Sequence, residues 1–414
     1  MSTTRMLETV VIKFGGSVLE DEKAVTQVAS LIKETKNKGR GVAVVVSAMK
    51  GVTDQIMAAS KRENPQIEPN LLDELLSSGE KTSARLVATA LASFGIQSVV
   101  VDPETAYWPV ITDDKHLDAN PLVEVTRAKT QQLIIPLISA GKVPVVCGFL
   151  GKTMRGKTTT LGRGGSDTTA VLLGNCLDAK EVILVKDIEG VYSSDPHKVT
   201  NPQLIESLNG EEAEMLAAGG AKFLHVKALR YQSTGLRIRV TNLERLDSGT
   251  VIKGELSPVQ VDMLDEGVSM ITVVGLNPQK TESIIRAARA VREAGGDLLA
   301  ISLETNAAIF YVGGGKNVLD GVHRVLVEDK IGKAVSEFPR LSMIMVKGAA
   351  LETEKGVVQR ITSPLAHASI NVYGIVTILS SVRVFVSADD SSKAHALVRE
   401  AMMGTGKKGE QIQR

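Results

Sequence analysis

Hydrophobic residues in roughly the first 250 positions follow two alternating patterns. Short runs rich in β-branched residues are separated by longer segments in which apolar residues recur every three or four positions. The runs predict buried strands, and the longer segments predict amphipathic helices. The predicted strands are Val10–Lys13, Val42–Val46, Val99–Val101, Val143–Cys147, Glu181–Val185 and Arg237–Val240.

Two of the helical patterns are especially regular. Their apolar positions are Val25, Val28, Ala29 and Ile32 in the first, and Leu86, Ala90, Leu91 and Phe94 in the second. Strands that alternate with amphipathic helices are typical of βαβ units, in which a mainly parallel sheet is buried beneath helices. We therefore predict an α/β sandwich for the first domain, residues 1–255.

A weak internal repeat marks the rest of the chain. The segment Ser269–Gly275 returns as Ser342–Gly348, with five of seven residues identical at an offset of 73. After each copy we expect a helix and two paired strands, which are Thr281–Ala294, Leu298–Leu303 and Ala307–Val312, then Thr353–His367, Asn371–Leu379 and Arg383–Val386. This pattern predicts two small βαββαβ domains, over 265–335 and 340–403. Residues 404–414 are polar and glycine-rich, which predicts a flexible tail.

Length and charge narrow the class of protein. A chain of 414 residues is too long for one hydrophobic core, so two or three domains are expected. Its 48 Lys+Arg balance 47 Asp+Glu, and a net charge of +1 gives no field for nucleic acid or a membrane surface. The sequence shows no apolar run typical of a signal peptide or a membrane span, so we expect a cytoplasmic protein. Cys147 and Cys176 have no metal-ligand spacing and are interpreted as buried apolar positions.

The loops that follow predicted strands carry the candidate chemistry, because ligands bind at the carboxyl ends of parallel strands. The first loop, KFGGSV, begins at Lys13. Gly15 and Gly16 would let backbone N–H groups approach a phosphate, and Lys13 could neutralise its charge. A Gly-Gly pair is also a common turn, so this loop alone favours a structural role as much as a functional one.

Two further loops carry weaker signals on their own. The segment from Ser47 to Thr53 offers two hydroxyls and a glycine to a small ligand. The segment SSGE, which ends at Glu80, is predicted to precede a helix, where Ser and Glu are typical capping residues.

The segment TTTLGRGGSDTTA, Thr158–Ala170, is the most informative. It combines three glycines, an arginine and a Ser-Asp pair, and it opens a predicted helix that runs to about Leu177. Arg163 could hold a carboxylate through two parallel N–H bonds, while Asp167 has little structural need for its charge. Together with Lys13 and the glycine-flanked Lys222, these loops indicate a phosphoryl-transfer site.

A P-loop match at Gly151–Thr158 is interpreted as a coincidence. The spacing G-x-x-x-x-G-K-T is present, but a working P-loop leads directly into a helix. Here the segment continues into threonines and glycines, which favours a surface hairpin.

Taken in order, these motifs resemble the aspartate kinases of the amino-acid kinase family, over nearly the whole chain. The order is KFGG, SAM-x-GVTD, SGE, GRGGSD, D-x-x-G-V-Y-x-x-DP and GAK-x-LH. The resemblance implies a three-layer α/β/α sandwich of the amino-acid kinase type, followed by two ferredoxin-like ACT domains with a regulatory role. It also implies transfer of the γ-phosphoryl of ATP, with Mg²⁺, to the side chain of L-aspartate. The product, 4-phospho-L-aspartate, begins lysine, threonine and methionine biosynthesis.

The same resemblance implies roles for individual residues. Lys13 would stabilise the transferred phosphoryl group, and Asp167 would orient Lys13 and Lys222. Glu80 would face the substrate ammonium and Arg163 a substrate carboxylate. The residues implied for the amino-acid substrate are Ser47, Thr53, Glu80, Arg163 and Ser166. Those implied for the nucleotide are Gly15, Gly16, Asp187, Tyr192, Asp195 and Lys222.

The chain departs from the family pattern at several positions. Its glycine loop is one residue shorter than the usual KFGGTSV, Lys50 stands in place of a glycine, and Lys186 replaces a threonine beside the nucleotide. Val226 replaces a proline. The ACT-like domains lack the usual Pro-Gly-Val-Ala turn, so Asn371 is the one residue expected to contact a lysine or threonine effector.

Two alternatives compete with this hypothesis. The shortened glycine loop and Lys50 are compatible with a related kinase that acts on another small carboxylic acid. A non-catalytic amino-acid sensor is disfavoured, because a pure binding protein gains little from two lysines and Asp167. The open sheets of ACT-like domains leave edges that a second copy can cover, so a homodimer or larger homo-oligomer is expected.

Overall fold

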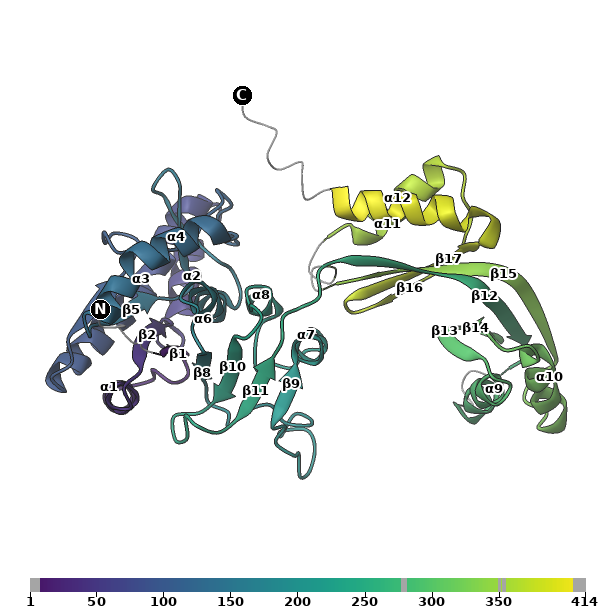
Figure 1. Ribbon diagram of the computed structural model, residues 1–414, viewed down its shortest axis with the longest axis horizontal. Helices are drawn as coiled ribbons and strands as arrows, with labels where there is room; N and C mark the ends of the chain where they lie inside the picture. Colours follow the sequence, from purple (N-terminus) through teal and green to yellow (C-terminus); the bar gives the residue numbers. More distant parts are fainter. Residues whose placement is uncertain (1–7, 277–280, 349–350, 352–354, 405–414) are drawn as a thin grey trace, which may run out of the picture. The chain divides into compact units, whose positions relative to one another are not determined.

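The computed structural model describes residues 8–276, 281–348, 351 and 355–404, and the chain folds into two compact units, Met1–Leu256 and Ser257–Arg414 (Figure 1). In the described part of the chain, no helix is both long enough and apolar enough to cross a membrane.

The first unit is built on a sheet of eight strands in the order β3-β5-β2-β1-β8-β10-β11-β9. The strands are β1 (Thr9–Phe14), β2 (Gly41–Val46), β3 (Ser98–Val101), β5 (Val143–Cys147), β8 (Glu181–Val185), β9 (Ser207–Asn209), β10 (Arg237–Thr241) and β11 (Thr250–Lys253). The six from β3 to β10 are mutually parallel and coincide with the six predicted strands, while β11 is antiparallel to β10. The prediction of a mainly parallel sheet is confirmed.

Helices cover this sheet in two groups. They are α1 (Glu22–Asn37), α2 (Val52–Glu63), α3 (Pro69–Ser93), α4 (Val123–Leu133), α5 (Ile135–Ser139), α6 (Gly165–Cys176), α7 (Gly210–Ala218) and α8 (Val226–Leu229). Helices α1 and α2 pack on α3, which lies against β2, β3 and β5, whereas α4 and α8 pack on α6, which lies against β1 and β8. All six residues of β2 are buried, so both faces of the sheet are covered. The three-layer sandwich is confirmed.

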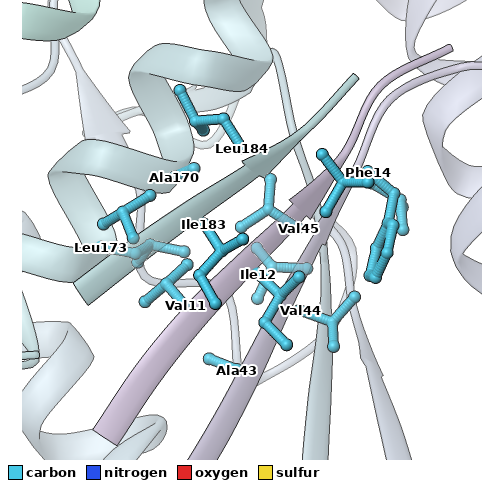
Figure 2. Close-up of a cluster of buried hydrophobic side chains, with 14 of the residues drawn as sticks. Val11, Ile12, Phe14, Ala43, Val44, Val45, Ala170, Leu173, Ile183 and Leu184 are labelled. Atoms are coloured by element: carbon cyan, nitrogen blue, oxygen red, sulfur yellow. The ribbon is translucent and has the colours of Figure 1, made fainter. Parts of the chain in front are cut away.

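The centre of the sheet holds the core that fixes the strand ends in place. Figure 2 shows Val11 and Ile12 of β1 between Val44 of β2 and Ile183 of β8, with Leu173 reaching in from α6. Each of these side chains is at most 2% exposed. Burial of branched side chains on both faces at this density stabilises the unit and leaves the strand ends little freedom.

Two local predictions for α3 are wrong. Leu86, predicted to face the core, is 42% exposed, because the buried face of α3 runs through Ala84, Val87 and Leu91. The SSGE segment does not precede a helix but lies in the middle of α3, which begins at Pro69. Proline is favoured in the first turn of a helix, where its missing N–H has no partner to lose.

The chance P-loop match forms the predicted hairpin. Strands β6 (Leu150–Thr153) and β7 (Thr158–Thr160) pair antiparallel, and β6 also pairs with β4 (Ile111–Thr112). The turn residues 154–157 are exposed. Cys147 and Cys176 are buried free thiols, as predicted. The helix predicted to begin in the segment Thr158–Ala170 is α6.

The second unit contains one antiparallel sheet of six strands in the order β13-β14-β12-β15-β17-β16. The strands are β12 (Gln260–Val274), β13 (Asp297–Glu304), β14 (Ala307–Gly313), β15 (Ala334–Lys347), β16 (Val372–Ile378) and β17 (Ser381–Ser387). The helices are α9 (Thr281–Glu293), α10 (Val318–Glu328), α11 (Val357–His367) and α12 (Ser391–Met403), with the 3₁₀ turn η1 (Ala388–Asp390). Both predicted strand pairs, β13 with β14 and β16 with β17, are confirmed.

The two long strands divide this sheet into two interleaved halves. The first part of β12, Gln260–Leu264, pairs with the end of β15, whereas Val268–Val274 pairs with its beginning. The half formed with β13 and β14 is covered by α9 and α10, and the half formed with β16 and β17 by α11 and α12. Figure 1 shows the two helix pairs on opposite sides of the sheet. The strand from Gln260 to Leu264 therefore completes the half whose other strands come last in the sequence.

The faces of the two halves that carry no helices share a small core. The rings of Tyr311 and Phe385 stack with centroids 4.0 Å apart, and the Tyr311 hydroxyl donates to the carbonyl of Tyr373 at 2.9 Å. The predicted start of a helix at Thr353 and the tail after Gly404 lie outside the described residues.

Candidate active site

A pocket of about 280 Å³ opens at the carboxyl ends of β1, β2 and β5 and at the N-terminus of α6. Its lining includes every residue proposed for the amino-acid substrate, together with two of the proposed catalytic residues. These are Lys13, Ser47, Thr53, Glu80, Arg163, Ser166 and Asp167. Segments that lie far apart in the sequence thus meet at one pocket, as the parallel strand order requires.

Close backbone packing shapes this pocket. A Cβ on Gly16 would lie 2.7 Å from the carbonyl oxygen of Ala48, and a Cβ on Gly79 would lie 2.7 Å from the Ala48 side chain. A Cβ on Gly148 would lie 2.8 Å from the Cβ of Ser166. These distances leave no room for a side chain, so the glycines allow the loops after β1, β2 and β5 to touch their neighbours.

Lys13 and Asp167 form the buried centre of the site. The Lys13 Nζ lies 2.7 Å from Asp167 Oδ1, and both side chains are 7% exposed. The other carboxylate oxygen, Oδ2, accepts a hydrogen bond from Lys186 Nζ at 2.9 Å. We expected Lys222 as the second lysine of Asp167, and the structure has Lys186 there instead.

The charges of this cluster act on one another. Burial lowers the pKa of Lys13, and the neighbouring Lys186 lowers it further, while Asp167 opposes both effects. Burial alone would raise the pKa of Asp167, but Lys13 and Lys186 hold it well below its usual range. Asp167 is therefore an anion at neutral pH, and the three groups together carry one excess positive charge when both lysines are protonated.

Glu80 supplies a second buried carboxylate to the site. It projects from the middle of α3, is 3% exposed, and accepts a hydrogen bond at Oε1 from the backbone N–H of Ala48 at 3.1 Å. No group among the described residues donates to Oε2. Burial raises the pKa of Glu80 to about 7. A cationic ligand group would relieve this desolvation, because an unpaired buried carboxylate is costly.

The loop that precedes α6, Gly162–Gly164, carries Arg163 to the mouth of the pocket. Gly162 and Gly164 both have φ near +73°, a conformation that favours glycine. A Cβ on Gly164 would also lie 2.2 Å from the Cβ of His225. His225 caps α8, its Nδ1 accepting from the N–H of Lys227 at 3.3 Å, and burial lowers its pKa, which favours the neutral ring.

Two buried polar residues that no sequence motif identifies, Asp73 and Lys227, stabilise the segment before this loop. Asp73 is fully buried and accepts from the Thr160 hydroxyl at 2.6 Å and from the N–H of Leu117 at 3.2 Å. Lys227 Nζ donates to the carbonyls of Ala119 at 2.9 Å and Leu161 at 2.7 Å. No short motif announces either residue, because each is recognised only through partners distant in sequence.

Most of the residues proposed for the nucleotide lie outside this pocket. Gly15 donates its N–H to the carbonyl of Val185 at 3.2 Å and lies beside Lys13. Asp187, Asp195 and Lys222 are exposed, and these three do not line the pocket.

Three other proposed or divergent residues also lie outside the pocket. Tyr192 is half-buried and donates to Glu189 Oε2 at 3.2 Å. Lys50 pairs with Glu20 on the surface. Asn371, proposed for an effector, is exposed just before β16 in the second unit. In the described residues, no group of three or more His, Cys, Asp or Glu side chains could hold a metal ion.

Comparison with known proteins agrees with this geometry. Residues 8–242 match the model of the amino acid kinase family. An aspartokinase of Corynebacterium glutamicum is 30% identical to this chain over 423 residues, covering 95% of the chain and 96% of that relative. The chain belongs to the amino acid kinase family, among the aspartokinases.

Solved structures of the same family share the fold. The crystal structure of aspartate kinase from Synechocystis superposes with a TM-score of 0.74 and 24% identity, covering 95% of this chain and 69% of that chain. Escherichia coli aspartokinase III, solved in complex with aspartate and ADP, gives a TM-score of 0.55 and 21% identity, covering 96% of this chain and all of that one. The family fold thus extends through both units.

Proposed function

We propose that this chain transfers the γ-phosphoryl group of ATP to the side-chain carboxylate of L-aspartate, giving 4-phospho-L-aspartate and ADP. The observation that carries the proposal is the charge pattern of one pocket. A buried carboxylate with a free oxygen, Glu80, and the guanidinium of Arg163 line the same cavity as the Lys13–Asp167 pair. With Lys186, that pair carries one excess positive charge, so the site presents one anion, Glu80, and two net cationic charges. An amino acid with a second carboxylate, which has one cationic and two anionic groups, matches this pattern.

The roles follow from the charges. Glu80 would bind the substrate ammonium, and Arg163 would bind a carboxylate through two N–H groups. Lys13 would neutralise charge on the transferred group. The hydroxyls of Ser47, Thr53 and Ser166 would complete the binding of the amino acid.

The reaction needs positioning more than proton transfer. An aspartate side chain, with an ordinary pKa of about 4, is already ionised at neutral pH, so no general base is required. Its oxygen forms a bond to the γ-phosphorus while the bond between that phosphorus and the β,γ-bridging oxygen breaks, and ADP leaves with the electron pair.

Mg²⁺ fits the proposal as a partner of the nucleotide. Because the ion prefers phosphate oxygens and water, one or two carboxylates suffice to hold it, and Asp187 and Asp195 are exposed carboxylates in the loop proposed for the nucleotide. When bound, Mg²⁺ would supply charge neutralisation at the phosphates.

A hydroxylamine trapping assay tests the proposal. Purified protein with ATP, Mg²⁺ and L-aspartate should yield aspartyl hydroxamate, and Lys13→Ala should lower kcat by about 10³-fold. Running glutamate and N-acetylglutamate in parallel tests the related-kinase alternative. Absence of hydroxamate with every acid, or equal rates for the wild type and Lys13→Ala, would overturn the assignment.

We also propose a homodimer or larger homo-oligomer, with lysine or threonine as the effector that contacts Asn371. The strands β13 and β16 are the two edges of the second unit's sheet, and such edges favour pairing with another chain. Light scattering should give a mass above the 44.1 kDa of one chain. A monomer at micromolar concentration would contradict the oligomer, and equal inhibition of Asn371→Ala and wild type would contradict the effector contact.

A further inference from the structure

We propose that Lys186 is the second lysine of the phosphoryl-transfer centre, sharing Asp167 with Lys13 and adding the positive charge that receives the transferred group. This inference rests on the proposed function and assigns to Lys186 the part that the sequence resemblance implied for Lys222. It concerns a position at which this chain departs from the pattern of its family.

The sheet order brings Lys186 to Lys13. Strands β1 and β8 are parallel neighbours, with Phe14 opposite Val185, so Lys186 follows directly after the last paired residue. Its backbone N–H donates to the carbonyl of Thr241 at 2.8 Å, next to the end of β10. The backbone at Lys186 is therefore fixed by its position beside the ends of β1 and β10.

The side chain of Lys186 is mostly buried and binds Asp167. Its Nζ donates to Asp167 Oδ2 at 2.9 Å, and the side chain is only 15% exposed. Lys222, in contrast, is exposed in the segment between α7 and α8. Two strand-end lysines on one carboxylate form a rigid arrangement, because each ammonium helps to fix the orientation of the carboxylate that the other one binds.

The net charge of the cluster of Lys13, Asp167 and Lys186 favours the binding of an anion. Asp167 neutralises one of the two ammonium groups, so one positive charge is left at a place where burial makes it costly. The cluster also lies beside the glycine pair: a Cβ on Gly15 would be 3.4 Å from Lys13 Nζ and 3.5 Å from the carbonyl of Val185. A phosphoryl group that approaches the Gly15 backbone would meet this excess charge, which is the condition for transition-state stabilisation.

The competing explanation is that Lys186 serves only as a counter-ion that allows Asp167 to be buried. In that case its loss would lower stability without changing the chemistry of correctly folded protein. Kinetic constants per folded molecule separate the two explanations, and a pH profile tests the electrostatic coupling between Lys186 and Lys13.

The experiment compares Lys186→Met, Lys186→Arg, Lys222→Met and the surface control Lys180→Met. Lys180 comes directly before β8, whereas Lys186 comes directly after it. The Lys180 side chain is 56% exposed and pairs with Glu8. Lys186→Met should lower kcat by about 100-fold with less than threefold change in the KM for aspartate. Lys186→Arg should recover part of the loss, and Lys180→Met should match the wild type.

The pH profile gives an independent readout. The charged groups that act on Lys13 are Asp167, which raises its pKa, and Lys186, which lowers it. Removing Lys186 should therefore raise the pKa of Lys13, so the alkaline limb of kcat should move to higher pH in Lys186→Met. A structural counter-ion would move this limb in the same direction, because its charge is removed in either case. The kcat measured at a pH where Lys13 is protonated therefore separates the two explanations.

The outcomes separate failure of the inference from failure of the proposed function. No hydroxamate from the wild type refutes the function itself. Wild-type activity with an unchanged kcat in folded Lys186→Met overturns the inference alone. A larger loss in kcat from Lys222→Met than from Lys186→Met would overturn it as well, since the second lysine would then be Lys222.

Discussion

The parts of the candidate site that we propose for the amino acid and for the nucleotide, called the amino-acid half and the nucleotide half below, are built in different ways. The amino-acid half draws its residues from helices and strand ends that touch through glycines, and its central groups, Glu80, Lys13 and Asp167, are all buried. The nucleotide half draws Asp187, Tyr192 and Asp195 from a long irregular segment between β8 and β9, and Asp187 and Asp195 are exposed.

This difference has an energetic meaning. Buried charges interact strongly with a ligand because water does not screen them, and fixed side chains lose little entropy when the ligand binds. Exposed charges contribute at most about 1 kcal/mol each. Substitutions in the amino-acid half should therefore cost far more than comparable substitutions in the nucleotide half.

Glu80→Gln should show the largest effect of the changes that probe this comparison. At pH 8 the KM for aspartate should rise about 100-fold or more, because the substrate ammonium would lose its buried partner. In the wild type, kcat/KM for aspartate should fall as the pH drops below about 7, where Glu80 becomes protonated. Gln cannot titrate, so the variant should lose this limb. Initial-rate measurements between pH 6 and 9 check both points, and a variant with wild-type KM would refute the role.

The same substitution should change stability in a known direction. The pKa of Glu80 is raised from 4.5 to about 7, so the folded protein binds more protons than the unfolded chain in this window. Its stability contribution is present below pH 4.5 and is lost as the pH rises through 7. At pH 8, Glu80→Gln should therefore be more stable than the wild type, by up to about 3 kcal/mol. Denaturant unfolding at pH 8 and pH 5 measures the difference, which should shrink to about 1 kcal/mol or less at the lower pH.

Arg163→Lys should have an intermediate effect. Lysine keeps the charge but cannot form two parallel N–H bonds to one carboxylate. Because Arg163 is exposed at the mouth of the pocket, we expect the KM for aspartate to rise only about fivefold, with kcat changed less. A KM effect on ATP rather than on aspartate would place Arg163 in the nucleotide half instead.

Tyr192→Phe should have the smallest effect. The substitution removes only a hydroxyl that donates to Glu189 near the surface. The KM for ATP should change by less than about threefold, and that for aspartate should stay the same. A change of 30-fold or more would show that the nucleotide half is as tightly organised as the amino-acid half, and would break the comparison.

The strands and the glycine loops of the first unit were predictable from sequence because their signals are local. Runs of valine and isoleucine identify the strands, and the parallel order then brings Lys13, Ser47 and Arg163 to one edge. The choice between Lys186 and Lys222 as the partner of Asp167 was not predictable, because it depends on β8 lying next to β1. Sheet order is a long-range property that no local pattern records.

Other failures have the same origin. Glu80 was assigned to a helix start because Ser and Glu favour caps, but tertiary packing against Ala48 extends α3 through that segment. Asp73 lies in the same helix and carries no motif, since its partners Thr160 and Leu117 lie 87 and 44 residues away. Local propensity is a weak guide wherever distant contacts decide the conformation.

The strand from Gln260 to Leu264 bears on how the chain folds during synthesis. Its partner, the end of β15, is translated about 80 residues later, after all of α9, β13, β14 and α10. Until then, the segment that immediately follows the kinase unit presents an unpaired edge, and a ribosome stalled before Met343 would leave it that way. Closing this strand pair joins residues about 80 positions apart, which makes its formation a slow, non-local step. The first segment out of the kinase unit therefore stays unpaired until β15 has been completed.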